Sequence, residues 1–249
     1  MFLTAHDTAQ QQGGRSHQCD ATATAAASGE VVAFAVLDGI GSCPEVTAWT
    51  REAADRVARA VLHARSAEDG LRQVYDDYAA AGPEFAGAWE QIGAAALVAL
   101  VVPGQPLELA WCGDVRAYAI RDDQAEQLTR DHNARRVHLD RGKEVGPYDR
   151  NRLTSCLGSD ETDDEVRDQH GHPAIESTTV DPEELRLVLA TDGAYEPLED
   201  FGTPFPVYLT GVPAEAAEDF VATAVHRSRM VTLPQHVDNA TAMVIDLVP

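Results

Sequence analysis

The sequence predicts a single domain of mixed α and β structure, with antiparallel strands in its core. Three observations lead to this fold class. Apolar runs of strand length, such as VVAFAVL at 31–37, recur along the chain. Longer segments with helical spacing of their apolar residues stand between some of these runs. Finally, the strand-like runs from residue 93 onward are joined by connections too short for a crossover helix.

The order of the elements can be predicted from the same patterns. Residues 45–64 carry apolar side chains on one face and charges on the other, which indicates an amphipathic helix. Further helices are expected at about 67–80 and near 213–228. Strands are expected at 31–37 and in the segments GAAALVALVV, LELAWCGD, RAYAIRDD, LRLVLATDG and NATAMVIDLV. The second, third and fourth of these strands are interpreted as consecutive antiparallel neighbours.

The stretch from 130 to 172 shows no sustained periodicity and is rich in charge. A long irregular stretch of this kind is typical of a functional flap. Its acidic run SDETDDE is interpreted as a solvated loop. His170 and His172 are interpreted as surface histidines, because no third zinc ligand of a suitable type lies near them in the sequence.

Composition limits the partners and the compartment. The 249 residues can bury a sizeable core, and no linker divides them, so 1–249 is expected to be one domain and a monomer. A formal net charge of −22 opposes binding to nucleic acid or to an anionic membrane. The start turns polar after three residues, and no apolar run approaches membrane length, so a cytoplasmic protein is expected. The four cysteines are scattered, which favours free and mostly buried thiols.

Four acids stand at the margins of predicted strands. Asp38, Asp114 and Asp192 end the runs FAVLD, LAWCGD and LATD, and Asp238 immediately precedes NATAMVIDL. If the strand ends converge, these carboxylates converge as well, and clustered anions raise one another's pKa unless a cation holds them ionised. A set of oxygen ligands suits Mg²⁺ or Mn²⁺ better than zinc or copper.

A simpler interpretation exists for each acid taken alone, because Asp-Gly is among the commonest turn dipeptides. Gly39 beside Asp38 would let its carbonyl approach an ion without a side chain in the way. Gly193 beside Asp192 is interpreted as a tight turn only. Because four acids stand at strand margins, a cation site and a set of ordinary turns are equal alternatives from these residues alone.

Seven segments make the sequence similar to a known family. RSHQCDA, VLDGIG, WCGDVRAY, LTRDHN, NRLTSCLG, LATDGAYE and DNATAMVI occur in the order of the signature segments of metal-dependent protein serine/threonine phosphatases of type 2C. The resemblance extends from Arg15 to Asp246. The bacterial branch is the most similar, because Ile40 follows Asp38-Gly39 where many eukaryotic members carry a histidine.

The resemblance implies a fold and a metal centre. The fold would be an αββα sandwich, in which two central antiparallel sheets are flanked by helices and the metals lie at one end between the sheets. Asp38 would bridge two Mn²⁺ or Mg²⁺ ions, with the Gly39 carbonyl on the first. Asp192 and Asp238 would bind the second ion. Asp114, together with Asp192, matches the acids that hold a third, weaker ion.

The resemblance also implies the chemistry, which is hydrolysis of phosphoserine or phosphothreonine on a phosphorylated protein. Two metal ions lower the pKa of a bridging water, whose hydroxide attacks phosphorus in line. Arg15 matches the arginine that grips the substrate phosphate, and Asp20 would hold metal-bound water from the outer shell. Ile40 cannot donate a proton to the leaving oxygen, so metal-bound water is the expected donor.

Other classes can be tested against the sequence. The sequence contains no Cys-x5-Arg pattern, which excludes a cysteine-dependent phosphatase. It also lacks a Gly-x-Ser-x-Gly elbow and a complete P-loop, which disfavours a serine hydrolase and a P-loop NTPase. Departures from the family pattern are Gly41-Ser42 after the bridging acid, and Ala94 and Ala95 where Thr or Ser is common. The second of these departures is expected to affect packing rather than catalysis. The alternative to an enzyme is a phosphatase-like fold that binds a phosphoprotein without turnover.

Overall fold

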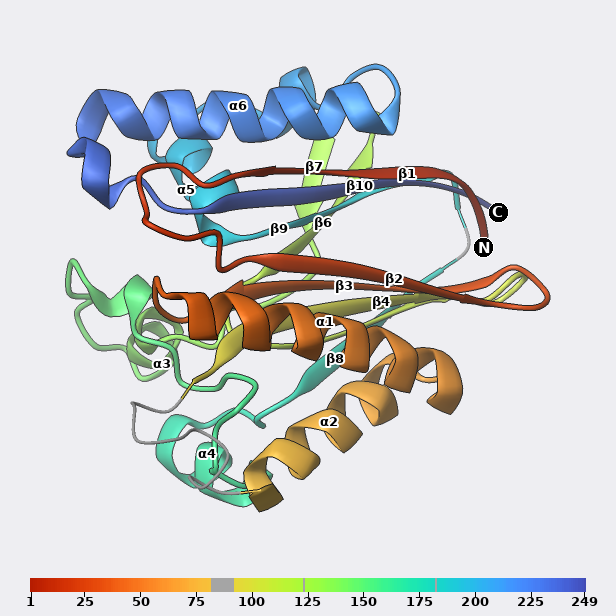
Figure 1. The fold of residues 1–249 in the computed structure, drawn as a ribbon, viewed down its shortest axis with the longest axis horizontal. Helices are drawn as coiled ribbons and strands as arrows, with labels where there is room; N and C mark the ends of the chain where they lie inside the picture. The colour runs from red at the N-terminus through yellow and green to blue at the C-terminus, as the bar shows by residue number, and fades with distance from the viewer. Residues whose placement is uncertain (82–91, 123, 182) are drawn as a thin grey trace.

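Two five-stranded antiparallel sheets lie face to face, and helices cover the outer face of each (Figure 1). The computed structural model describes residues 1–81, 92–122, 124–181 and 183–249. The β3 sheet has the order β2 (Ala21–Ala27), β3 (Val31–Gly39), β4 (Ala94–Val101), β5 (Leu107–Cys112) and β8 (Glu176–Val180). The β9 sheet has the order β1 (Phe2–Gln11), β10 (Ala240–Val248), β9 (Leu185–Ala190), β6 (Arg116–Arg121) and β7 (Gln124–Gln127). The predicted fold class is confirmed.

The helices complete the four layers. The β3 sheet is covered by α1 (Pro44–Ala64) and α2 (Ala67–Ala81), and the β9 sheet by α5 (Asp192–Asp200) and α6 (Pro213–Val231). The shorter helices are α3 (Ala134–Asp140), α4 (Asp163–His170) and the 3₁₀ turns η2 (Asp149–Asn151), η3 (Phe205–Tyr208) and η4 (Pro234–His236). Within the described ranges, no helix combines the length and apolar character needed to cross a bilayer.

Alternate residues of the central strands face different layers. Phe34 of β3 and Leu189 of β9 pack between the two sheets, whereas Leu37 packs toward α1 and Val188 toward α6. Because both faces of these strands are buried, the strands appear in the sequence as continuous apolar runs. This double burial makes them rigid supports for the residues at their ends.

One predicted strand pairing is wrong. The β4 and β5 strands do pair, but β5 and β6 belong to different sheets. The chain changes sheet at Gly113, which has φ +101°, and a Cβ there would lie 2.3 Å from the Cβ of Ala95. A glycine is therefore required at this crossing. The short connection looks like a hairpin in the sequence, although it joins the two sheets.

Several elements were not expected from the sequence. The edge strands β1, β2, β7 and β8 are polar or rich in small residues, so they lack the apolar runs on which the strand prediction rested. The helix α5 was also missed, because it begins at Asp192, where a turn was expected. Gly193 lies in its first turn, and a Cβ there would lie 2.0 Å from Asn239 O. The tight-turn interpretation of Gly193 is therefore wrong.

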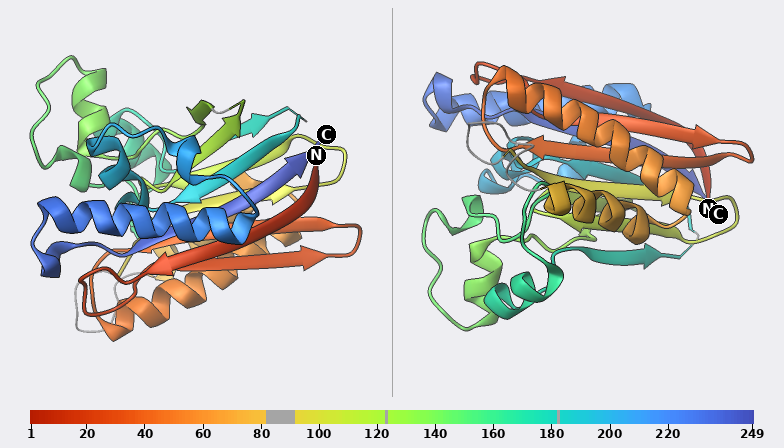
Figure 2. Two further views of the ribbon diagram at one scale, coloured as in Figure 1. Left: turned by 90° about the horizontal axis from the view of Figure 1, so that it is seen from above. Right: turned by 60° about the horizontal axis from the view of Figure 1, so that its bottom comes forward.

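The 130–172 flap projects at one end of the sandwich (Figure 2) and contains more regular structure than expected. It holds α3, η2 and α4, and the acidic run supplies the start of α4, where Thr162 and Glu165 form a capping box. His172 is only 3% exposed and stacks on His132, with ring centroids 4.4 Å apart. The surface interpretation of His172 is wrong, because tertiary packing covers it.

Candidate metal centre

Four strand ends meet at the flap end of the sandwich and border a cavity of about 440 Å³. Asp38 is the penultimate residue of β3, and Asp114 lies in the sheet-crossing turn after β5. Asp192 opens α5 just after β9, and Asp238 stands two residues before β10. All four acids line the cavity, together with Arg15, Gly39, Ile40, Gly41, Ala95, Asn151, Leu153 and Cys156.

The acids repel one another strongly. Burial, together with Asp20, Asp192, Asp114 and Asp238, raises the pKa of Asp38 well above its ordinary value. The pKa of Asp114 is raised in the same way, first by burial and then by Asp192. The pKa of Asp192 rises to about 6, through burial and the neighbouring Asp238. A cation in the cavity would relieve this repulsion and keep the carboxylates ionised.

Asp20 lies buried behind the cavity, at 2% exposure, and one of its oxygens lacks a partner. Its Oδ2 accepts hydrogen bonds from Thr241 Oγ1 at 2.7 Å and Thr191 Oγ1 at 3.0 Å. Its Oδ1 is buried with no hydrogen-bond partner. Burial with the charges of Asp192 and Asp238 raises its pKa to about 7, although both threonine hydroxyls act to lower it. A buried carboxylate oxygen without a donor in the protein can accept a hydrogen bond from water or contact a bound ion.

Gly39 permits the close packing that places Asp38. A Cβ at this position would lie 2.5 Å from Cys19 O and 2.6 Å from Thr50 Oγ1. The end of β3 can therefore approach the segment before β2 and the helix α1 only because residue 39 has no side chain. Its backbone lines the cavity beside Asp38, where a carbonyl could join the carboxylates as an oxygen donor.

Arg15 enters the cavity from the loop between β1 and β2. Its Nη2 lies 2.5 Å from Asp238 Oδ2, and its side chain is 37% exposed. Asn239, whose role the sequence did not suggest, holds this loop in place. Its Nδ2 donates to the carbonyls of Gln12 and His17, at 2.9 and 3.0 Å, and its Oδ1 accepts from Cys19 N–H at 2.7 Å. Asn239 thereby keeps Arg15 beside the acids.

The flap and α5 add residues that sequence reasoning missed. Arg150 of η2 pairs with Glu196 at 3.3 Å and, through two contacts of 3.1 Å, with Asp200. Burial and the charge of Asp192 raise the pKa of Glu196 to about 7. Glu196 follows Asp192 by one helical turn, so a correct prediction of α5 would have placed both on one face. The Arg150 contacts fasten the flap to α5 at the cavity.

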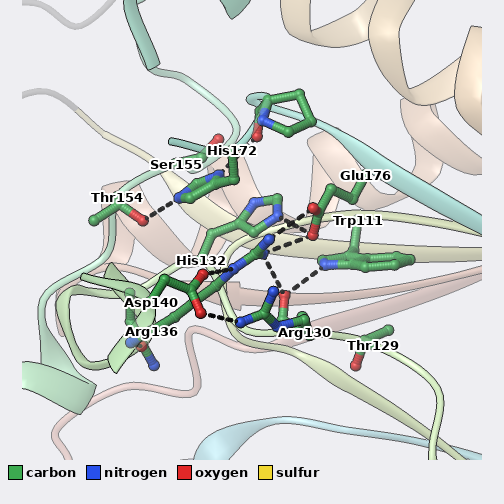
Figure 3. A network of polar contacts seen from close by, with 12 residues as sticks. Trp111, Thr129, Arg130, His132, Arg136, Asp140, Thr154, Ser155, His172 and Glu176 are labelled. Atoms are coloured by element: carbon green, nitrogen blue, oxygen red, sulfur yellow. Dashed lines mark hydrogen bonds and ion pairs between the residues drawn. The ribbon is translucent and has the colours of Figure 1, made fainter. Parts of the chain in front are cut away.

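A second set of contacts holds the turn that carries Asp114, and Figure 3 shows the polar network behind it. His132 N–H donates to Gly113 O at 2.8 Å, and Gly113 N–H donates to His132 Nδ1 at 3.4 Å. With Nδ1 accepting, Nε2 carries the proton and donates to Glu176 Oε2 at 3.1 Å. Arg136 forks onto Glu176 at 2.6 and 2.8 Å, and these bonds hold the pKa of Glu176 below its usual range despite burial, which acts to raise it.

The donor set fits a hard divalent cation. Carboxylates of Asp38, Asp114, Asp192 and Asp238 and the backbone of Gly39 share one cavity, and oxygen donors of this kind are preferred by Mg²⁺ and Mn²⁺. In the parts of the chain that the structure describes, no three His, Cys, Asp or Glu side chains already form a ligand group.

Known proteins are similar to this chain in sequence and in fold. A family model described as protein phosphatase 2C matches residues 4–138. The probable protein phosphatase 2C 30 of Arabidopsis thaliana is 27% identical over 175 residues, which cover 66% of this chain and 45% of that protein, so the chain spans less than half the length of this relative.

Solved structures match over nearly the whole chain. The serine/threonine phosphatase of S. agalactiae superposes with a TM-score of 0.78 at 17% identity, covering 98% of this chain and 99% of that one. The catalytic domain of the serine/threonine protein phosphatase PstP, in complex with two manganese ions, superposes with a TM-score of 0.67 at 20% identity, covering 98% of each chain. At these identities, the likeness shows a shared fold.

Proposed function

The chain belongs to the protein phosphatase 2C family, and from this premise we propose that it hydrolyses phosphoserine and phosphothreonine on proteins in a metal-dependent reaction. One observation carries the proposal most directly. Four acids from separate strand ends, together with Arg15, line a single cavity. Such a cavity can hold divalent cations and receive a phosphate at the same place.

The proposed ligand set uses residues of this chain only. Asp38 and the Gly39 carbonyl would hold one ion, Asp38, Asp192 and Asp238 a second, and Asp114 with Asp192 a third. Bound Mn²⁺ or Mg²⁺ supplies an activated water nucleophile and neutralises phosphate charge. The raised pKa values of Asp38, Asp114 and Asp192 support this assignment, because these carboxylates gain most from a cation.

Arg15 and Asp20 would prepare the substrate and the water. The Arg15 guanidinium can bind two phosphate oxygens in a fork, and Asp238, now 2.5 Å away, keeps it in the cavity. Asp20 is aimed by Thr191 and Thr241, and its free Oδ1 can accept a hydrogen bond from a water in the cavity. Ile40 carries no acidic proton, so water would protonate the leaving serine or threonine oxygen.

Composition supports several finer parts of the proposal. A formal net charge of −22 favours a protein substrate over nucleic acid or an anionic membrane. All four cysteines are free thiols, which supports a reducing compartment such as the cytoplasm. We propose that residues 1–249 act as one monomeric phosphatase domain.

The test is Mn²⁺-dependent release of phosphate from a phosphothreonine peptide. Turnover should require Mn²⁺ or Mg²⁺ and should fall at least a hundredfold in Asp192→Asn, because losing a metal ligand removes both nucleophile activation and charge neutralisation. An exposed acid away from the cavity provides the control, as Asp55→Asn should leave turnover unchanged. Metal binding without any turnover would reject the enzyme and support a phosphoprotein-binding role.

A further inference from the structure

The longest stretch of this acidic chain without an acid lies near its C-terminal end. Residues 220–237 contain no Asp or Glu, although the whole chain has 41. The stretch covers the second half of α6 and all of η4. Its ionisable residues are the cations Arg227 and Arg229 and the histidines His226 and His236. This stretch therefore adds two arginines to the surface and no carboxylate of its own.

The same stretch exposes large apolar side chains. Met230 is 62% exposed, Val231 71% and Leu233 62%. Arg229 and His236 are exposed beside them, and neither takes part in the ion pairs formed among the described residues. We call these five residues the α6 rim. Exposed apolar residues bordered by an unpaired arginine are typical of a surface that binds a partner.

The rim adjoins the loop that carries Arg15. Gly14 N–H donates to Val237 O at 2.8 Å, and a Cβ at Gly14 would lie 1.6 Å from Pro234 O. The backbone after α6 therefore packs directly on the residue before Arg15. Figure 1 shows the end of α6 and the β1–β2 loop at the same end of the molecule as the flap. A substrate whose phosphate reaches Arg15 passes close to the rim.

We propose that the α6 rim binds the residues that flank the phosphorylated residue of a phosphoprotein substrate, and that it selects flanks with an acidic and an apolar side chain. The inference rests on the proposed phosphatase function and adds a substrate class to it. Arg229 can pair with a flanking carboxylate, while Met230, Val231 and Leu233 cover an apolar neighbour.

The overall negative charge does not oppose this selection. Charges further away than about 8 Å are largely screened at physiological ionic strength. An acidic flank lying on the rim therefore experiences Arg229 more strongly than the acids that lie further away than this screening length. Two arginines on a chain of net charge −22 are too few to draw the protein to an anionic membrane, where several basic residues act together.

The experiment compares phosphothreonine peptides that share a core and differ in their flanks, either Glu and Leu or Lys and Ser. Wild type should prefer the Glu/Leu peptide. Arg229→Glu should lower kcat/KM for that peptide about two- to fivefold through KM, with less effect at 500 mM than at 50 mM NaCl. Leu233→Ser should lower it at both salt concentrations. Arg59→Glu, at an exposed position on α1, is the control.

A small substrate separates this inference from the proposed function. Turnover of p-nitrophenyl phosphate, which has no flanks, should be unchanged in Arg229→Glu and Leu233→Ser. The proposal for the rim would be overturned if the variants lost kcat/KM equally on both peptides and on the small substrate. It would also be overturned if wild type showed no preference between the peptides. If wild type turns over nothing, the proposed function fails. Fluorescence anisotropy with the same peptides, labelled, then tests peptide binding to the rim separately. The proposal requires that wild type binds the Glu/Leu peptide more tightly and that Arg229→Glu loses this preference.

Discussion

Arg116 and Asp131 form a two-bond ion pair, in which Nε and Nη2 each donate to one carboxylate oxygen at 2.8 Å. Arg116 follows the candidate ligand Asp114 by two residues, and Asp131 opens the flap. The next flap residue, His132, bonds to Gly113 on the other side of Asp114. Two consecutive flap residues therefore hold both sides of the turn that carries Asp114.

We predict that Asp131→Ala will cost about 2–3 kcal/mol in free energy of unfolding, because the buried Arg116 loses both bonds to this carboxylate and keeps only Glu199, at 2.8 Å, as a charged partner. It should also raise the Mn²⁺ concentration needed for half-maximal activity, because the Asp114 turn loses one of its two restraints. Urea denaturation and a Mn²⁺ titration measure the two effects. The control is Asp140→Ala, which removes an exposed carboxylate paired with Arg130 and, at 3.7 Å, with Arg136, and should cost no more than about 1 kcal/mol. Equal stabilities of the two variants would show that the pair does not hold the turn.

The second prediction concerns the repulsion between the acids. Asp192→Asn should stabilise the metal-free protein by about 1–3 kcal/mol at pH 7, because it removes one half-buried charge whose pKa is raised. It should at the same time weaken Mn²⁺ binding, measured by isothermal titration calorimetry. Thermal unfolding in EDTA gives the first effect, with Asp55→Asn as the exposed control. Destabilisation of the metal-free variant would mean that Asp192 is held by favourable contacts and not strained by its neighbours.

The third prediction is a pH dependence from His172. Burial and the neighbouring His132 lower its pKa from 6.5 to about 4. Below pH 6.5 the unfolded chain takes up a proton that the folded protein does not accept until about pH 4. The stability that depends on neutral His172 is therefore complete above pH 6.5 and is lost as the pH falls toward 4.

His172→Gln should reduce the slope of the unfolding free energy against pH between pH 6.5 and 4.5. The reduction should correspond to at most one proton in the difference between protons bound by the unfolded and by the folded protein. The variant is compared with wild type and with His63→Gln, an exposed position on α1. This comparison is needed because acids such as Asp20, whose pKa is raised to about 7, change the pH slope of stability in the opposite direction. Their contribution is the same in all three proteins and cancels in the comparison. Identical slopes in all three would show that His172 titrates normally.

The fourth prediction concerns the loop that carries Arg15. Asn239→Ala removes three hydrogen bonds to the backbone of this loop and should cost about 2–4 kcal/mol in stability. Because Arg15 loses its support, KM for a phosphopeptide should rise more than kcat falls. Gln124→Ala, at an exposed position on the edge strand β7, should change neither constant. A fall in kcat at unchanged KM would place the effect of Asn239 on the metals instead.

Much of the candidate site could be predicted from local patterns. Asp38 and Asp192 end strands that are buried on both faces, and such strands are visible in the sequence as apolar runs. Glu196 was missed because the helix that aligns it with Asp192 was taken for a turn. His172 was missed because a histidine between Gly171 and Pro173 gives no sign of the His132 ring that covers it.

The sequence by itself determined which residues have carboxylates at strand ends, and the central strands and helices that support them, because buried periodicity is a local property. Only the tertiary structure decided that β5 and β6 lie in different sheets, that the flap folds back to hold Gly113 and Arg116, and that an acid-free end of α6 borders Arg15. Those outcomes depend on contacts between residues far apart in the chain. A local pattern carries no record of such contacts, because they form only when the two sheets pack.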